Sequence, residues 1–103
     1  MNILWSNLAE DSLVAIYTYY REVAGVHIAR MIKNEILAAS KQLIKHPQSG
    51  QIEDLLKQLD EGHRYLVVRN HKIIYKQINE GILITDVFDT RQDPIKIIRP
   101  KRK

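Results

Sequence analysis

Three short apolar runs separated by turn residues fill the second half of the chain, and they constrain its fold more than any other feature. The first turn, Arg69-Asn70-His71, contains an asparagine, which tolerates the left-handed conformation. The second, Asn79-Glu80-Gly81, predicts a three-residue hairpin loop with glycine at the left-handed position. We therefore predict an antiparallel meander between Arg64 and Pro94. Its strands are residues 65–68, 72–78 and 82–88.

The first quarter of the chain predicts a short edge strand at Ile3-Leu4-Trp5 followed by an amphipathic helix. Ser6 and Asn7 both suit a helix N-cap, and Asn7 with Glu10 approximates a capping box. Gly25 is expected to end the helix as a left-handed C-terminal cap. Three- and four-residue steps predict one buried face, made of Ala9, Leu13, Ile16, Tyr17, Tyr20 and Ala24.

A second helix is predicted from about Val26 to Lys45, and the very short join makes the two helices an antiparallel hairpin. Its water-facing side carries Arg30, Lys33, Lys41 and Lys45, and its buried stripe is Ala29, Ile32, Ile36, Ala39 and Leu43. Residues 46–50, with one proline and one glycine, break the pattern. Residues 52–59 fit either a brief third helix or an ordered loop.

The size and charge of the chain indicate how many domains it forms and what kind of partner it binds. At 103 residues it forms one domain, 1–103, whose last residues, 96–103, are a basic tail. Residues 1–63 carry a net charge of −2 and residues 64–103 carry +6, which together give the overall +4. A basic C-terminal half indicates an anionic partner. The absence of cysteine and of any apolar run of about 20 residues favours a cytoplasmic protein with no membrane partner.

The sequence predicts neither a cofactor nor a metal site. It has no glycine-rich phosphate loop and no Gly-x-Ser-x-Gly elbow. The four histidines have no metal-ligand spacing and are expected at the surface or in turns. We retain His71 as a candidate because it stands beside Lys72 and near Arg64 in the expected sheet.

Cations on the predicted strands are stronger candidates for a functional site than the histidines. Antiparallel pairing is expected to bring them together on one exposed surface that could hold phosphates or carboxylates. The alternative is a set of scaffold ion pairs, in which Arg64 binds Asp86 or Asp89 and Arg91 binds Asp93. Tyr75 is more often a sheet-packing residue than a catalytic one. The predicted target- or phosphate-binding cluster is Arg64, Lys72, Lys76 and Arg91.

The order of these motifs resembles the RelE/ParE superfamily of bacterial toxins. The N-terminal half matches through Trp5, Ala9, Leu13-x-x-Ile16 and Leu43-x-x-x-Pro47-x-x-Gly50, and the C-terminal half through His63-Arg64-Tyr65, Tyr75 and Ile84-x-x-Val87-x-x-x-Arg91. The resemblance implies an α+β fold. Its parts are an N-terminal strand, an antiparallel helical hairpin and a mainly antiparallel sheet that ends in a three-stranded meander.

The resemblance also implies a toxin of a type II toxin–antitoxin system, which a cognate antitoxin neutralises and which meets DNA only through that antitoxin. The RelE branch comprises ribosome-dependent mRNA endoribonucleases, whereas the ParE branch inhibits DNA gyrase. No tyrosine or histidine follows Arg91, and a ribonuclease needs groups that move protons. We therefore favour the ParE branch and a non-enzymatic toxin.

Two alternatives stay open, together with the surface that the antitoxin would bind. One alternative is a RelE-like ribonuclease, and the other is an inactive homologue that only binds antitoxin. An amphipathic segment of an acidic antitoxin is expected to lie over the hairpin or to add a strand to the sheet, with Val23, Ile28 and Leu37 as contacts. The catalytic set of a ribonuclease would be Arg64, His71, Lys72, Tyr75 and Arg91.

Overall fold

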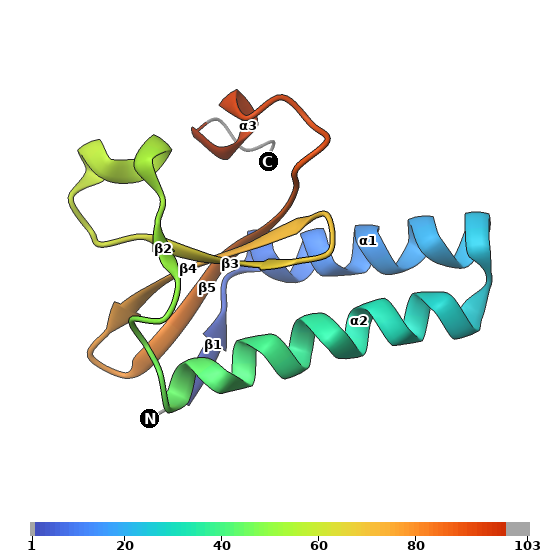
Figure 1. The fold of residues 1–103 in the computed structure, drawn as a ribbon, viewed down its shortest axis with the longest axis horizontal. Coiled ribbons are helices and arrows are strands. Elements are labelled where there is room, and N and C mark those ends of the chain that lie inside the picture. The colour runs from blue at the N-terminus through green and yellow to red at the C-terminus, as the bar shows by residue number, and fades with distance from the viewer. Residues whose placement is uncertain (1, 99–103) are drawn as a thin grey trace.

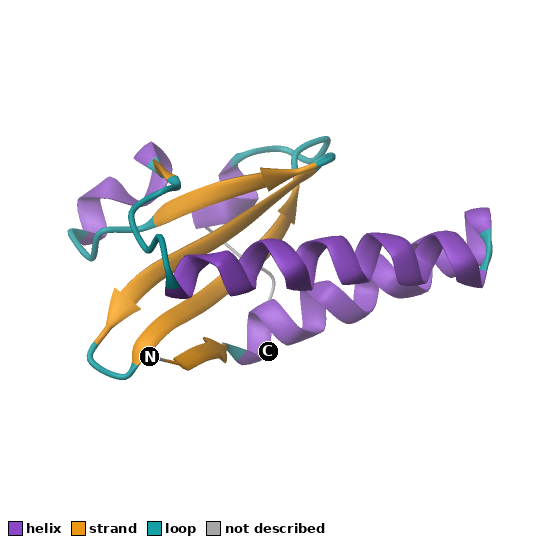
Figure 2. Cartoon of the chain, turned by 60° about the horizontal axis from the view of Figure 1, so that its bottom comes forward, coloured by secondary structure: helices purple, strands orange, loops and turns teal. Residues whose placement is uncertain are grey.

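A computed structural model describes residues 2–98 and shows two helices packed on one face of a five-stranded sheet (Figures 1 and 2). This is the predicted α+β fold. The elements are β1 (Asn2–Trp5), α1 (Asn7–Ala24), α2 (Val26–Lys41), the 3₁₀ helix η1 (Gln42–Ile44), β2 (Gln51–Ile52), the 3₁₀ helix η2 (Asp54–Leu59), β3 (Arg64–Val68), β4 (His71–Ile78), β5 (Gly81–Asp89) and α3 (Ile95–Ile98).

The sheet has the strand order β1-β5-β4-β3-β2. Strands β2 to β5 pair antiparallel, and β1 joins the outer side of β5 in parallel, which confirms both the meander and the N-terminal edge strand. Residues 52–59, left open by the sequence, end β2 and then form η2. Among residues 2–98, no helix has the length and apolar character needed to cross a membrane.

Both turns of the meander differ from the prediction. Arg69, not Asn70, has the positive φ of 55° in the first turn, and His71 is already the first residue of β4. The Arg69 guanidinium donates to the Glu35 carboxylate of α2 over 2.6 and 3.0 Å, which links this turn to the helical hairpin. Gly81 has the positive φ expected of the glycine, at 146°, but it begins β5 rather than closing a loop. A Cβ there would collide with the carbonyl oxygen of Asn2, so glycine is needed for β1 to pair.

The ends of the two hairpin helices also differ from the sequence prediction. The Ser6 side chain caps α1 by accepting from the Ala9 amide over 3.0 Å, so the proposed box of Asn7 and Glu10 is wrong. Gly25 joins the helices alone, with φ 96° and ψ 166°, which is outside the left-handed helical region. The second helix ends at Lys41, because η1 tightens the chain before the predicted end.

The hairpin reaches well beyond the sheet, as Figure 1 shows at its right side. Residues 21–28 are all exposed, including Ala24, which the helical periodicity had placed on the buried face. That periodicity reports which side of a helix could be buried, but the sheet covers only the part of the hairpin nearest to it. The hairpin end therefore presents apolar side chains to solvent.

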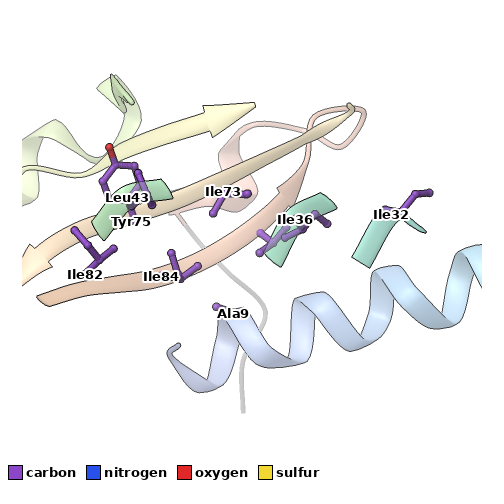
Figure 3. Close-up of a cluster of buried hydrophobic side chains, with 9 residues drawn as sticks. Ala9, Ile32, Ile36, Leu43, Ile73, Tyr75, Ile82 and Ile84 are labelled. Atoms are coloured by element: carbon purple, nitrogen blue, oxygen red, sulfur yellow. The ribbon is translucent and has the colours of Figure 1, made fainter. Parts of the chain in front are cut away.

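The main core lies between the hairpin and the sheet (Figure 3). It confirms the predicted stripe of the second helix, except that Ala39 is only partly buried and Ser40 is also buried. Tyr17 is half-buried rather than central, and the cations of Arg21 and Lys33 lie 5.9 and 5.6 Å from the centre of its ring. The buried members are Ala9, Ile32, Ile36, Leu43, Ile73, Tyr75, Ile82, Ile84 and Val87.

A second, smaller core covers the opposite face of the sheet. Ile74, Phe88 and Ile97 are its buried members, and leucines of η2 pack against them. Strand alternation alone places two apolar sets on β4, and η2 with α3 cover the second set. Residues 96–98 of the predicted basic tail thus belong to α3, and residues 99–103 lie outside the described part of the chain.

Candidate functional site

The four cations expected to form one cluster lie on two different faces of the sheet. Arg64 is paired with Tyr75, whose side chain is in the core beneath the helices, so Arg64 starts from that same face. Lys72 and Lys76 alternate with Tyr75 along β4 and point to the other face. The predicted convergence of these side chains is therefore wrong.

Arg64 and Arg91 also stand at opposite ends of the meander. Tyr75 is opposite Arg64, and His71 is opposite Asp89, just before Arg91. Four residues of β4 separate these two positions, a distance of about 13 Å along an extended strand. The sequence identified the strands, but it did not define how far each cation lies along them.

Lys72 and Lys76 are each bound to a carboxylate. Lys72 Nζ lies 2.8 Å from Glu53 Oε2 and 4.1 Å from the centre of the Tyr65 ring. The Glu53 side chain is only 3% exposed, so this is a nearly buried ion pair that fastens the start of η2 to the sheet. Lys76 Nζ lies 2.6 Å from the exposed carboxylate of Glu61.

Arg64 binds backbone carbonyls and forms no ion pair with the residues that the structure describes. Its Nη1 donates to the carbonyl oxygen of Gly50 over 2.8 Å and more weakly to that of Gln48 over 3.4 Å. The guanidinium therefore keeps its full positive charge beside the loop after η1. The alternative interpretation, in which Arg64 binds Asp86 or Asp89, is therefore wrong for this arginine.

The hydroxyl of Tyr75 belongs to the same loop. It donates to the carbonyl oxygen of Pro47 over 2.9 Å and accepts from the Gly50 amide over 3.0 Å. The side chain is buried, and that burial raises the pKa of the Tyr75 hydroxyl. Gly50 has no room for a side chain, because a Cβ would lie 2.7 Å from the Tyr75 hydroxyl oxygen. The role of Tyr75 is therefore structural, because these contacts close the loop onto the sheet.

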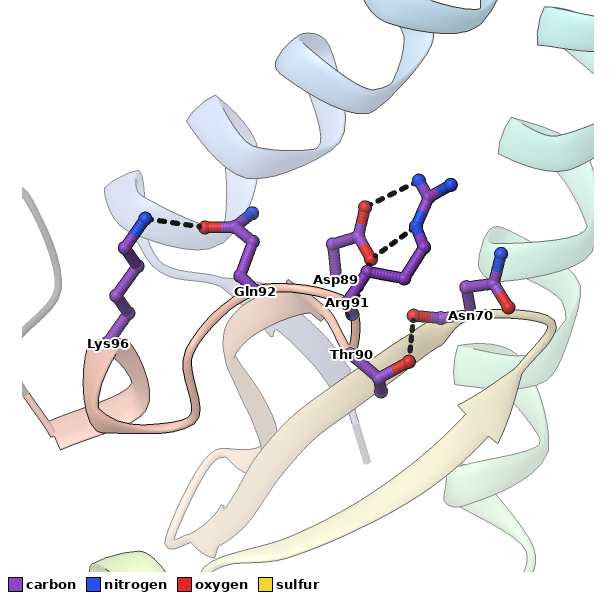
Figure 4. A network of polar contacts seen from close by, with 6 residues as sticks. All are labelled: Asn70, Asp89, Thr90, Arg91, Gln92 and Lys96. Atoms are coloured by element: carbon purple, nitrogen blue, oxygen red, sulfur yellow. Dashed lines mark hydrogen bonds and ion pairs between the residues drawn. The ribbon is translucent and has the colours of Figure 1, made fainter.

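Arg91 lies just past the end of β5 and binds Asp89, not the Asp93 of the alternative interpretation (Figure 4). Its Nε and Nη2 donate to the two carboxylate oxygens over 3.0 and 2.7 Å. The hydrogen bonds from Arg91 lower the pKa of Asp89 and raise that of Arg91. The Arg91 side chain is nevertheless 53% exposed, so its outer surface remains available.

A cleft of about 400 Å³ opens between α1 and the end of β5, next to this pair. His71 lies in its wall, in edge-to-face contact with the Tyr20 ring at 6.2 Å, and burial lowers the pKa of the histidine. Ser12 lines this cleft and a second, smaller one beside α1, and it donates to Asp86 over 2.8 Å. The cleft is lined by Ser12, Ala15, Ile16, Tyr19, Tyr20, His71, Val87, Asp89, Arg91 and Gln92.

Comparison with known proteins identifies the family. The family model for the ParE toxin of type II toxin–antitoxin systems, parDE, matches residues 3–94. The chain belongs to this ParE toxin family. The fold is similar to that of the chromosomal ParDE TA system from P. aeruginosa, with a TM-score of 0.73 and 20% identity over 86% of this chain and 95% of that chain. No curated protein matches the chain.

Family membership confirms the resemblance to the RelE/ParE superfamily and its ParE-like branch. Within residues 2–98 of this ParE-family chain, no group of three or more His, Asp or Glu side chains could hold a metal ion. Sequence reasoning missed the lining that α1 gives to the cleft. The signal was the spacing of Ser12 and Tyr19, seven residues apart on the flank of the predicted helix.

Proposed function

We propose that this chain is the toxin of a type II toxin–antitoxin system and that it inhibits DNA gyrase. The observation that carries the choice of gyrase over mRNA is the separation of the polar groups on the sheet. A ribonuclease needs a proton donor, a proton acceptor and cations around one phosphate. In residues 2–98 the candidate cations lie on two faces, and the Tyr75 hydroxyl is occupied by the loop. This arrangement supports a toxin that acts by binding.

For the contact with the target we propose Arg91 and the cleft beside it. Arg91 is more exposed than Lys72 or Lys76, whose side chains are each 22% exposed. Arg64 offers a second, separate cation at the far end of the meander. Asp89 orients the Arg91 guanidinium, so that its free edge can meet an acidic group of the target.

For the antitoxin we propose the protruding end of the helical hairpin. Val23 and Ile28 are 60% and 38% exposed there, and Val26 lies between them in the chain with an exposure close to that of Ile28. An amphipathic helix with an apolar face would cover this surface. Leu37 is half-buried and would add to the contact only at its margin. With this target and this antitoxin, the proposed site of action is the cytoplasm.

Supercoiling by purified gyrase tests the proposal. We expect added toxin to block supercoiling of a relaxed plasmid, and we expect Arg91→Ala to weaken the block at least about tenfold, the loss of one charged contact worth about 1.4 kcal/mol. Lys57→Ala is the matched control, since Lys57 is an exposed cation of η2, away from the cleft. Full supercoiling at saturating toxin would refute gyrase as the target.

A further inference from the structure

A group of cations outside any ion pair lies on α2 and just after it, apart from Arg64 of the sheet, which is also outside any ion pair of residues 2–98. Among residues 2–98, each ion pair involves a cation of the meander or its ends, namely Arg69, Lys72, Lys76 or Arg91. No carboxylate of the described residues lies within ion-pair distance of the cations of α2 and of the residues just after it. These cations, which we call the α2 stripe, are Arg30, Lys33, Lys41 and Lys45.

The geometry of α2 puts the stripe on one side of the helix. At 100° per residue, Arg30, Lys33 and Lys41 fall within a sector of about 80°. They are exposed, and the buried Ile32 and Ile36 point away from that sector toward the sheet. Lys45 follows η1 at the same end as Lys41, and it is exposed as well. The stripe is therefore exposed, with Lys33 at its border with α1, where Lys33 Nζ lies 5.6 Å from the centre of the Tyr17 ring.

The surroundings of the stripe do not cancel its charge. Glu35 is the one acid of α2, and both of its oxygens accept hydrogen bonds from Arg69. Helix α1 carries the opposite charge, with Glu10, Asp11 and Glu22 against Arg21. An anionic partner would therefore approach from the α2 side. The acids of α1 discourage a shift onto the neighbouring helix.

The composition of the stripe favours a nucleic acid over an acidic protein. Protein–protein contacts need an apolar centre, whereas protein–DNA contacts are more polar and positive. At 100° per residue, the half-buried Leu37 falls between Lys33 and Lys41, and the exposed Asn34 and Ala38 lie beside the sector. Leu37 is half-buried, so this face has no exposed apolar centre, and its four cations outside any ion pair of residues 2–98 suit phosphates.

We propose that the α2 stripe binds the phosphate backbone of duplex DNA directly. Lys33 and Lys41 are about 12 Å apart along the helix axis, which matches the width of about 12 Å of the major groove of B-DNA. Arg30 with Lys33 can thus meet one wall of phosphates, and Lys41 with Lys45 the other. The major groove of an RNA duplex is too narrow for this arrangement.

Fluorescence anisotropy with a labelled DNA duplex of about two helical turns measures this binding. Four phosphate contacts predict a slope of about −3.6 for log K against log salt. The affinity should then fall about 150-fold between about 50 and about 200 mM salt. An RNA duplex of the same length should bind more weakly.

Two double variants, which each remove two positive charges, test whether DNA binding depends on the stripe or only on the net charge. Lys41→Gln with Lys45→Gln should make the slope shallower by about 1.8. Lys57→Gln with Lys96→Gln should change it by less than about 0.5, although it removes the same charge. The basic residues 99–103 are present in both variants and cancel in the comparison. Circular dichroism and the thermal midpoint confirm that both are folded.

Three results would overturn the inference: no DNA binding at the lowest salt, equal slopes for the two double variants, or equal affinity for the RNA duplex. Gyrase inhibition is scored separately. The stripe variant should still block supercoiling, because it leaves Arg91 and its cleft intact. Loss of DNA binding and loss of gyrase inhibition are thus distinguishable.

Discussion

Replacing Tyr75 by phenylalanine tests whether its hydroxyl is structural. The substitution keeps the ring in the core but removes the group that accepts from the Gly50 amide and donates to Pro47. Gly50 is buried, so its amide would lose its partner without gaining water, at a cost of about 1–3 kcal/mol. The Pro47 residue is partly exposed, and its carbonyl can be rehydrated. We therefore expect a loss of about 2 kcal/mol in the free energy of unfolding.

Urea unfolding followed by far-UV circular dichroism measures this loss. A destabilisation of about 2 kcal/mol should lower the thermal midpoint by about 8–16 °C and the urea midpoint by roughly 1 to 2 M. The control is Tyr65→Phe, which removes a hydroxyl that donates to Gln51 at the exposed edge of the sheet. We expect that variant to stay within about 0.5 kcal/mol of the wild type.

The reasoning fails if Tyr75→Phe is as stable as Tyr65→Phe, because the loop would then not depend on the hydroxyl. It also fails if the folded Tyr75→Phe protein loses its toxic activity while the core and loop are retained. That second result would make the hydroxyl a functional group.

Three further predictions concern stability. Lys72→Met should cost about 3–5 kcal/mol in urea unfolding because it leaves a buried glutamate unpaired, whereas Lys76→Met, next to an exposed glutamate, should cost at most about 1 kcal/mol; equal costs would refute the buried clamp. Gly81→Ala should expel β1 and abolish the protection of its amides from hydrogen exchange, whereas Gly62→Ala, which meets no atom within 4 Å, should retain it. Because burial lowers the pKa of His71, the unfolded chain binds a proton at higher pH than the folded chain does, so stability is complete above about pH 7 and declines below about pH 6.5. His71→Gln should reduce that decline, and an unchanged pH profile would contradict this assignment.

Local sequence patterns predicted the helices and strands, but they did not predict how these elements are arranged in space. Apolar periodicity and turn residues located β1, the hairpin and the meander, since each depends on neighbours in the chain. Gly81 shows where this stops: a turn pattern predicts its positive φ, but not the collision of a Cβ with Asn2, which lies far away in the chain. Likewise, the ion pair between Arg69 and Glu35 depends on how α2 docks on the sheet, which no local pattern predicts.

The candidate site was harder to predict than the fold. Strand alternation sets the face on which each cation lies, and ion pairing sets whether that cation is free to bind a target. Lys72 and Arg64 differ by an even number of residues, yet they lie on different strands and on opposite faces. Their partners, Glu53 and the carbonyl of Gly50, come from an irregular segment whose path the sequence left open. The free cations of α2, by contrast, were correctly predicted to face water.

The central claim is that this ParE-family toxin acts by binding gyrase and not by cutting mRNA. The most direct measurement applies one toxin preparation to two reactions: plasmid supercoiling by gyrase, and translation of a defined mRNA on purified ribosomes. We predict that supercoiling stops and that the mRNA remains intact. Cleaved mRNA with normal supercoiling would contradict the account.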